Sequence, residues 1–390
     1  MIGIRFATVM LALVACMSAA RAEDKLKIGF ITTLSWPGTT NGREILDGFT
    51  LGIEDSGGKL GGRVIDLVVG DDENKPDVGV QLVRKMIEQD KVALFAGFVG
   101  SNITLAAANV ILPRHQILLV LNGGPSLLAG ERCNPYLFDV AFQSDTPAEA
   151  MAIYLQNQKV PNVFLATQNW PPGRDAVAGF KRYFKGDVVG ELYAPLNQFD
   201  YAAELAEIRN AKAKAMYFFF TGGASVINFV KQLAESGLKG QMGFYTQTNP
   251  LDDQTLPGIG DGAIGIESAG QWSEELDNPA NRAFVAHFRA KFGRRPSITA
   301  ANAYDGARLL DGALRITKGD ETGDAFLQAL ATAPFESVRG KFRFNRNRFP
   351  IQSFYLSKVE RRDDGTLGNR LEATIVDGHA DSYVGGCKAP

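Results

Sequence analysis

Six short segments, each directly after an apolar run typical of a β-strand, carry the side chains best suited to holding a small molecule. They are residues 33–40, 98–102, 122–126, 168–174, 221–225 and 246–249. They are rich in hydroxyl and amide side chains, glycine and tryptophan, and Arg174 is their only charged residue. This composition favours a ligand held by directional hydrogen bonds against an aromatic wall, with Thr221 among the candidate binding residues. Trp36 and Trp170 are the candidate wall, although each could equally be a packing residue.

Ser101 and Asn102 stand directly before a helical run. One interpretation is an ordinary N-cap, in which the side chain satisfies backbone N–H groups of the first turn. The other is that the same geometry aims free N–H groups and the positive helix end at an anion, so that a carboxylate binds without Arg or Lys. The sequence leaves both interpretations open.

The chain lacks the residue combinations typical of catalytic, metal-binding and nucleic-acid-binding sites. Its three His and three Cys are scattered, and it contains no Gly-x-Ser-x-Gly motif. No histidine falls in the six segments, so we assign no general base, no metal and no cofactor, and a secreted hydrolase is the disfavoured alternative. With 41 Lys+Arg against 43 Asp+Glu, the formal charge of −2 argues against a nucleic-acid partner.

The periodicity of the 390 residues predicts two α/β lobes. Strand-like runs alternate with helical periodicity, and each series implies a parallel sheet covered by helices on both faces. The expected strands are residues 27–32, 64–69, 92–97 and 117–121, then 162–167, 188–193, 215–220 and 241–245. Helices from residue 279, followed by β-rich segments at 340–344 and 352–359, suggest that the chain returns to the first lobe and crosses again. We therefore predict two Rossmann-like lobes with three crossovers, facing each other across a cleft lined by the six segments.

The first 22 residues are typical of a secretory signal, with Arg5, an apolar run at 6–15 and a small-x-small cleavage site at 20–22. In a competing interpretation, residues 13–16 form a lipoprotein box that would attach lipid to Cys16. The mature chain is expected in the periplasm in either case. Cys133 and Cys387 then share an oxidising compartment, where such a pair is more often a disulfide than two free thiols.

Several motifs, taken in order, resemble one family. They are Ile28-Gly29-Phe30, Asp47-Gly48, Asp71-Asp72, and residues 97–101, 134–138 and 303–306. Each is weak alone, but their order and spacing over nearly the whole mature chain resemble periplasmic binding proteins of the leucine/isoleucine/valine type. The resemblance implies the type I periplasmic binding protein fold and a solute-binding protein that delivers its ligand to an ABC transporter permease. A ligand sensor of the same fold is the alternative.

The resemblance also implies roles for individual positions. Ser101 falls where the family's serine binds the ligand carboxylate. Gly123 and Gly124 fall where backbone groups contact that carboxylate. Trp36 and Asn41 lie in the loop and helix start that border the pocket.

Departures from the family pattern indicate the ligand class. Amino-acid binders of the family pair the ligand ammonium with an acidic residue after a second-lobe strand, where this chain has Thr246 followed by Gln247. Burying an ammonium without a carboxylate is costly. Trp170 lies near the family's ligand-covering tyrosine, and residues 122–126 with the C-terminal Cys387-Lys388 resemble binders of aromatic carboxylates. We therefore expect an aromatic acid such as a benzoate or phenylpropanoid acid; a branched-chain or other amino acid or amide is the alternative.

The predicted organisation has a signal peptide at residues 1–22. The first lobe comprises 23–143 plus 274–345, and the second comprises 144–273 plus 346–390, including the C-terminal tail. The expected partners are a small carboxylate and a membrane permease, and the protein is expected to be a monomer that is not an enzyme.

Overall fold

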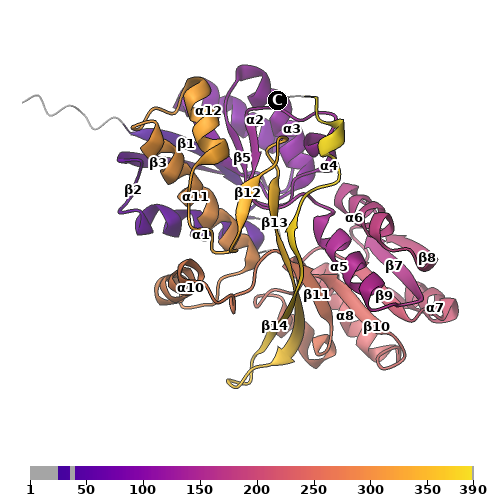
Figure 1. Ribbon diagram of the computed structural model, residues 1–390. Helices are drawn as coiled ribbons and strands as arrows, with labels where there is room; N and C mark the ends of the chain where they lie inside the picture. The colour runs from indigo at the N-terminus through magenta and orange to yellow at the C-terminus, as the bar shows by residue number, and fades with distance from the viewer. Residues whose placement is uncertain (1–24, 36–39, 389–390) are drawn as a thin grey trace, which may run out of the picture.

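The structure, a computed structural model, describes residues 25–35 and 40–388, which form two α/β lobes (Figure 1). The predicted signal peptide, Cys16 and Trp36 lie outside the described residues. The expected alternation of strands and helices is confirmed, with two sheets whose central strands run parallel.

The first lobe is built on a six-stranded sheet in the order β2-β3-β1-β4-β5-β6. Its strands pair in parallel except for β2, which pairs antiparallel with β3. The bounds are β1 (Leu26–Thr32), β2 (Lys59–Leu60), β3 (Arg63–Asp71), β4 (Leu94–Gly97), β5 (Leu118–Val120) and β6 (Leu137–Asp139). All four residues of β4 are buried, as expected for a central parallel strand covered on both faces.

Helices cover both faces of this sheet. One face packs against α1 (Asn41–Asp55), α11 (Ile298–Ile316) and α12 (Gly323–Thr332). The other packs against α2 (Pro76–Lys85), α3 (Ser101–Ile111) and α4 (Ser126–Ala129). A further helix, α10 (Pro279–Phe292), lies beside α1 and contributes Phe284 and Phe288 to a separate cluster with α11.

The second lobe is built on an eight-stranded sheet in the order β12-β13-β11-β10-β9-β7-β8, with β14 paired to β13. Five strands run parallel: β7 (Asn162–Gln168), β8 (Asp187–Ala194), β9 (Ala215–Phe219), β10 (Gly243–Gln247) and β11 (Glu267–Gly270). The antiparallel strands are β12 (Phe342–Phe344), β13 (Pro350–Arg361) and β14 (Leu367–His379). Its helices are α5 (Thr146–Asn157), α6 (Pro171–Tyr183), α7 (Ala202–Ala211), α8 (Ala224–Glu235) and α9 (Leu256–Ile259). Short helical turns span Met86–Asp90, Leu112–Arg114, Asn249–Leu251, Gly260–Ala263 and Val384–Gly386.

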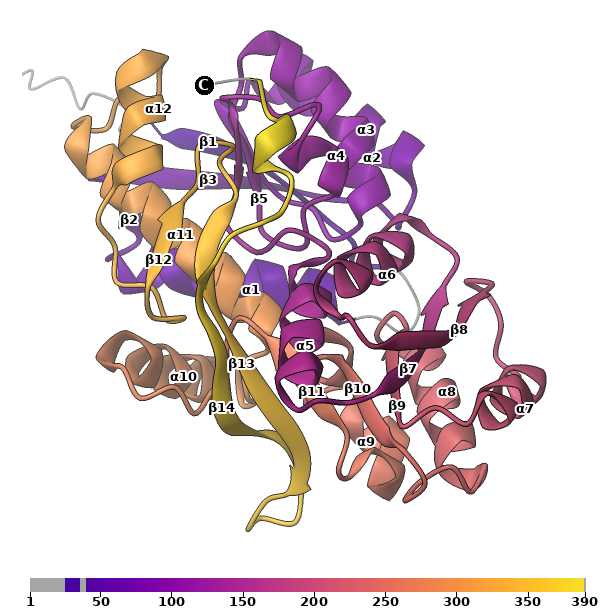
Figure 2. The same cartoon turned by 45° about the vertical axis from the view of Figure 1, so that its right-hand side comes forward.

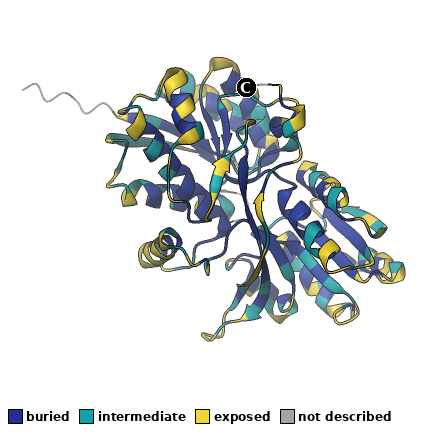
Figure 3. Cartoon of the chain, viewed as in Figure 1, coloured by how far each residue is buried: buried dark blue, intermediate teal, exposed yellow. Residues whose placement is uncertain are grey.

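The chain crosses between the lobes after β6, after β11 and along β13. The start of β13 pairs with β12, whose Phe342 and Phe344 pack against the first-lobe core, and its later residues pair with β11 of the second lobe. Buried residues are concentrated inside both lobes and at this junction (Figure 3). The fold thus has the three predicted crossovers; the exact lobe boundaries stay a prediction.

The C-terminal segment after β14 returns to the first lobe, where it lies beside α4 (Figure 2). Cys133 and Cys387 form a disulfide with a Cα–Cα distance of 5.5 Å. Asn347 Nδ2 donates to both carboxylate oxygens of Asp381 at 3.2 and 3.0 Å. This segment therefore adds a fourth link between the second sheet and the first lobe.

Candidate ligand-binding site

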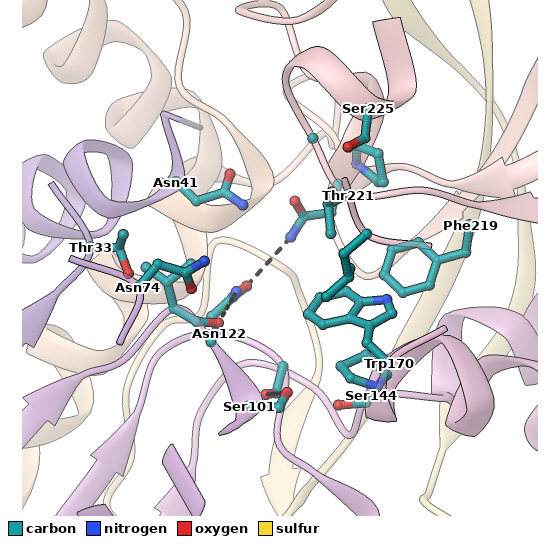
Figure 4. A pocket seen from close by; sticks show the side chains of 18 of the residues that line it. Thr33, Asn41, Asn74, Ser101, Asn122, Ser144, Trp170, Phe219, Thr221 and Ser225 are labelled. Atoms are coloured by element: carbon teal, nitrogen blue, oxygen red, sulfur yellow. Dashed lines mark hydrogen bonds between the residues drawn. The ribbon is translucent and has the colours of Figure 1, made fainter. Parts of the chain in front are cut away.

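A cavity of about 380 Å³ lies between the lobes, at the carboxyl ends of the parallel strands. Both lobes contribute to its wall (Figure 4). The first contributes Thr33, Asn41, Asn74, Val99, Gly100, Ser101, Asn102, Asn122, Gly123, Phe142 and Ser144; the second contributes Trp170, Pro172, Leu196, Asn197, Phe199, Phe219, Thr221, Gly222, Ala224, Ser225, Gln247, Asn249 and Pro250. None of these described lining residues has an ionisable side chain. The volume lies within the range of small-molecule sites.

The first lobe presents the N-terminus of α3 to the cavity. Gly100 is the N-cap, and its carbonyl accepts hydrogen bonds from the N–H groups of Ile103 and Thr104 at 3.0 and 2.9 Å. The N–H groups of the first two helical residues, Ser101 and Asn102, have no intrahelical acceptor. The hydroxyl of Ser101 lies 3.3 Å from the carbonyl oxygen of Gly123, which also lines the cavity. These donors, together with the positive helix end, favour an anion at this wall.

A sharp turn after β4 aims this helix end at the cavity. Gly97 has φ of 112° and Phe98 has φ of 67°, which is costly for a residue with a Cβ. A side chain on Gly97 would place its Cβ 2.3 Å from the carbonyl oxygen of Ile31. The fully buried ring of Phe98 and the hydrogen bond from its N–H to Ile31 O, at 2.6 Å, hold the turn in place.

Asn74 reaches the cavity from the turn after β3. Asp72 Oδ1 accepts hydrogen bonds from Thr33 Oγ1 at 2.6 Å and from the N–H of Asn74 at 2.9 Å. Asn74 adopts a left-handed backbone with φ of 59°. Burial raises the pKa of Asp72, while these two hydrogen bonds act in the opposite direction. Asp72 therefore serves to position its neighbours and does not itself line the cavity.

The second lobe supplies an aromatic wall. The rings of Trp170 and Phe219 lie side by side, with centroids 6.1 Å apart and planes inclined by 34° (Figure 4). Phe199, a residue that is 53% exposed, extends the wall toward solvent. Helix α6 begins with Pro171 and Pro172, which have no N–H groups, so this helix end presents an apolar surface instead of donors.

A second helix N-terminus, that of α8, faces the cavity. Its N-cap, Gly223, has φ of 80°, a conformation that favours glycine. Thr221, held by a hydrogen bond from its N–H to Gln168 Oε1 at 2.8 Å, lines the cavity together with Ser225. The second lobe thus offers hydroxyl and backbone donors beside its aromatic wall.

Gln247, and not Thr246, faces the cavity from β10. Thr246 Oγ1 donates to the carbonyl oxygen of Phe218 at 2.6 Å and is fully buried. Gln247 lines the cavity and its Nε2 donates to the hydroxyl of Tyr217 at 3.3 Å. The position expected to be acidic in an amino-acid binder is therefore uncharged here, whether Thr246 or Gln247 corresponds to it. Arg174 also stays out of the cavity, because its guanidinium donates to Asn169 Oδ1 at 2.7 Å and stacks on Tyr193.

The structure brings together seven of the residues singled out from the sequence: Asn41, Ser101, Asn102, Gly123, Trp170, Thr221 and Gln247. Gly124 does not line the cavity; its N–H donates to Phe142 O at 2.8 Å, and a Cβ on it would meet Asp139. Thr246 does not line it either, and Trp36 lies outside the described residues.

Sequence reasoning missed Asn74, Phe142 and Phe199 as lining residues. Phe199 and Leu196 lie in the loop after β8. Because ligands bind at the carboxyl ends of parallel strands, examining the loop after every such strand would have included both residues. Phe142 lies on the first crossover, so its place at the cavity depends on how the two lobes meet.

Among the described residues, no group of three or more His, Cys, Asp or Glu is arranged to hold a metal ion. Within the same part of the chain, no helix is both long and apolar enough to cross a bilayer.

Comparison with known proteins agrees with this architecture. Residues 25–366 match the family model described as periplasmic binding protein, and the chain belongs to this family. The resemblance noted in the sequence is therefore confirmed, and the chain is a solute-binding protein. A curated relative, the Leu/Ile/Val-binding protein homolog 6 of Brucella melitensis, is 24% identical over 377 residues, covering 94% of this chain and 95% of its own length.

Solved structures similar to this chain include several bound to aromatic acids. A solute-binding protein of an ABC transporter from Rhodopseudomonas palustris, in complex with 3,4-dihydroxybenzoic acid, is 31% identical with a TM-score of 0.85, covering 92% of this chain and 99% of that one. Another from R. palustris, in complex with benzoate, is 28% identical with a TM-score of 0.85, covering 93% and 99%. An ABC transporter substrate-binding protein from Sphaerobacter thermophilus is 30% identical with a TM-score of 0.87, covering 91% and 99%.

Proposed function

We propose that this protein captures an aromatic carboxylate between its two lobes in the periplasm and delivers it to the permease of an ABC transporter. The observation that carries the proposal is a cavity with no ionisable side chain among its described lining residues, a helix N-terminus on one wall and aromatic rings on the other. Residues 1–22 would direct export, with lipid attachment at Cys16 as the alternative.

The charge of the ligand follows from this lining. A carboxylate gains from the N–H groups and positive end of α3, and an apolar ring gains from contact with Trp170 and Phe219. An amino acid would also bring an ammonium group, which finds no carboxylate among the described lining residues. Burying that charge without a partner costs free energy that the apolar acid does not have to offset. The benzoate and dihydroxybenzoate bound by the two Rhodopseudomonas proteins support the same ligand class.

An amino acid or amide is the second candidate, favoured by the names of the curated Leu/Ile/Val-binding homologues. A thermal-shift screen of benzoates, phenylpropanoid acids, aliphatic acids and amino acids separates the two. A ligand present at 100 times its Kd stabilises the folded state by about 2.7 kcal/mol. We expect stabilisation by aromatic acids, and stabilisation by amino acids alone would refute the proposal.

A further inference from the structure

A hydrogen-bonded contact joins the lobes outside the cavity. The carboxylate of Asp175, on α6 of the second lobe, accepts hydrogen bonds from Ser126 Oγ at 3.0 Å and from the N–H of Ser126 at 3.4 Å. Ser126 is the first residue of α4 in the first lobe. Neither residue lines the cavity, so this contact joins the lobes without involving a ligand in the cavity.

Helix α6 connects this contact to both the cavity and the hinge. Trp170, its N-cap, forms part of the aromatic wall, and Asp175 lies just over one turn later. At the other end of the helix, Arg182 donates to Asp145 Oδ2 at 3.1 Å and also pairs with Glu149, next to the first crossover. Because α6 is a single helix, moving its cavity end onto a ligand also moves Asp175 relative to Ser126.

We propose that Ser126 and Asp175 form a closure latch, a pair of positioning residues that sets ligand affinity by stabilising the closed arrangement of the lobes. This inference rests on the proposed function, because it assumes that the lobes close over a ligand. It adds residues that hold the protein closed without touching what it binds.

The two partners are not equivalent. Burial raises the pKa of Asp175, whereas the hydrogen bonds from Ser126 lower it. Removing the Ser126 hydroxyl leaves a carboxylate that is desolvated on closure with one donor fewer. Removing the Asp175 carboxylate takes away the desolvated charge and leaves the neutral donors of Ser126, a half-buried residue that water can still reach. A latch therefore predicts that Ser126→Ala weakens ligand binding more than Asp175→Ala does.

The test compares S126A, D175A and the double variant with two controls, Ser236→Ala and Asp187→Ala. Ser236 Oγ bonds within the second lobe and Asp187 is exposed there, so these controls make the same chemical changes away from the lobe contact. We expect S126A to weaken binding of the aromatic acid selected by the screen about 10-fold, chiefly through faster dissociation. The affinity ratio between two aromatic acids should stay unchanged, and S126A should have no further effect in the D175A background.

A second readout does not need a ligand. Spin labels at Arg84→Cys on α2 and Glu207→Cys on α7, both exposed sites, report the distance between the lobes. We expect a larger open fraction in S126A than in the wild type or the controls. Equal distance distributions in S126A and wild type would overturn the latch. So would a changed affinity ratio between the two aromatic acids, or a loss of affinity from S126A that is as large in the D175A background as in the wild type. If the wild type bound no aromatic acid, the proposed ligand class would fail, while this distance measurement would still decide on the latch.

Discussion

At the scale of single residues, the described cavity lining has no cationic side chain, and N–H groups of the backbone serve as hydrogen-bond donors instead. Ser101 stands at the first position of α3, where its hydroxyl, 3.3 Å from the carbonyl oxygen of Gly123, and the N–H groups without an intrahelical acceptor belong to the same wall. Its position could be predicted because a strand-end loop leads directly into a helix. The roles of Asn74 and Phe142 could not, because each depends on contacts between segments far apart in the sequence.

Replacing Ser101 with alanine tests the carboxylate wall. A hydrogen bond to a charged group contributes about 1.5–3 kcal/mol, so S101A should weaken binding of an aromatic acid by about 10- to 100-fold. Isothermal titration calorimetry measures the change, with Ser236→Ala as a control that leaves the affinity unaltered. An S101A protein with wild-type affinity would show that the carboxylate binds elsewhere.

Replacing Gln247 with glutamate tests the absence of charge at the second-lobe wall. The new carboxylate would stand in the cavity at a position that is only 2% exposed and would repel a bound carboxylate. We expect Q247E to bind aromatic acids at least about tenfold more weakly, a loss of 1.4 kcal/mol or more. The control Gln241→Glu makes the same change at an exposed site just before β10. Unchanged affinity in Q247E would place the ligand away from this residue.

At the scale of elements, one buried arginine joins two of the three segments that cross between the lobes, the one after β6 and β13. Arg339 is fully buried; its Nε donates to Asp305 of α11 at 2.8 Å, and its Nη1 donates to Val140 O at 2.7 Å and to Gln352 Oε1 of β13 at 2.8 Å. The alternation of strands and helices predicted both lobes. It did not predict that a single strand, β13, serves both, because periodicity shows which face is buried and not which strand is the neighbour.

Removing the Arg339 side chain should strongly destabilise the protein. R339A leaves the buried carboxylate of Asp305 without its cation, a loss that typically costs about 3–5 kcal/mol. Urea denaturation measures the free energy of unfolding, and Arg343→Ala, an exposed change on the neighbouring β12, should alter it little. A loss in R339A no greater than that in R343A would contradict the assignment of Arg339 as the central link.

The junction of α1 with the loop before α11 should make stability depend on pH. Burial raises the pKa of Glu44 to about 7, against the opposing effects of Arg294 and Ser297. Because this pKa is higher in the folded protein than in the unfolded chain, Glu44 stabilises the folded state fully only below about pH 4.5 and loses that contribution as the pH rises to about 7. The loss from this group amounts to about 3 kcal/mol.

Urea denaturation between pH 4.5 and 8 checks this dependence. Glu44→Gln should flatten the decline in unfolding free energy between pH 4.5 and 7 relative to wild type. Glu54→Gln, an exposed change on the same helix, should leave the profile parallel to wild type. Parallel profiles for E44Q and wild type would contradict the shifted pKa.

At the scale of the whole molecule, the site exists only where two separately built lobes meet. Hydrogen bonds cross the cleft inside the cavity, from Asn249 Nδ2 to Asn122 Oδ1 at 3.4 Å, and outside it, from Ser126 to Asp175. The sequence predicted the two lobes and the strand ends that face each other, because both follow from local patterns. It did not predict these cross-lobe contacts, which depend on how far the lobes close. Of the two β10 residues singled out from the sequence, Thr246 and Gln247, only Gln247 lines the cavity, because successive side chains of a strand point to opposite faces.

The most direct measurement is calorimetric titration with two matched ligand pairs, phenylacetate against phenylglycine and 3-phenylpropanoate against phenylalanine. Within each pair the amino acid keeps the ring and carboxylate and adds an ammonium group. We predict that the acid binds at least about 100-fold more tightly than its amino analogue in the pair that fits the cavity, since an unpaired buried charge costs several kcal/mol. Equal or tighter binding of the amino acids in both pairs would contradict an aromatic carboxylate as the ligand.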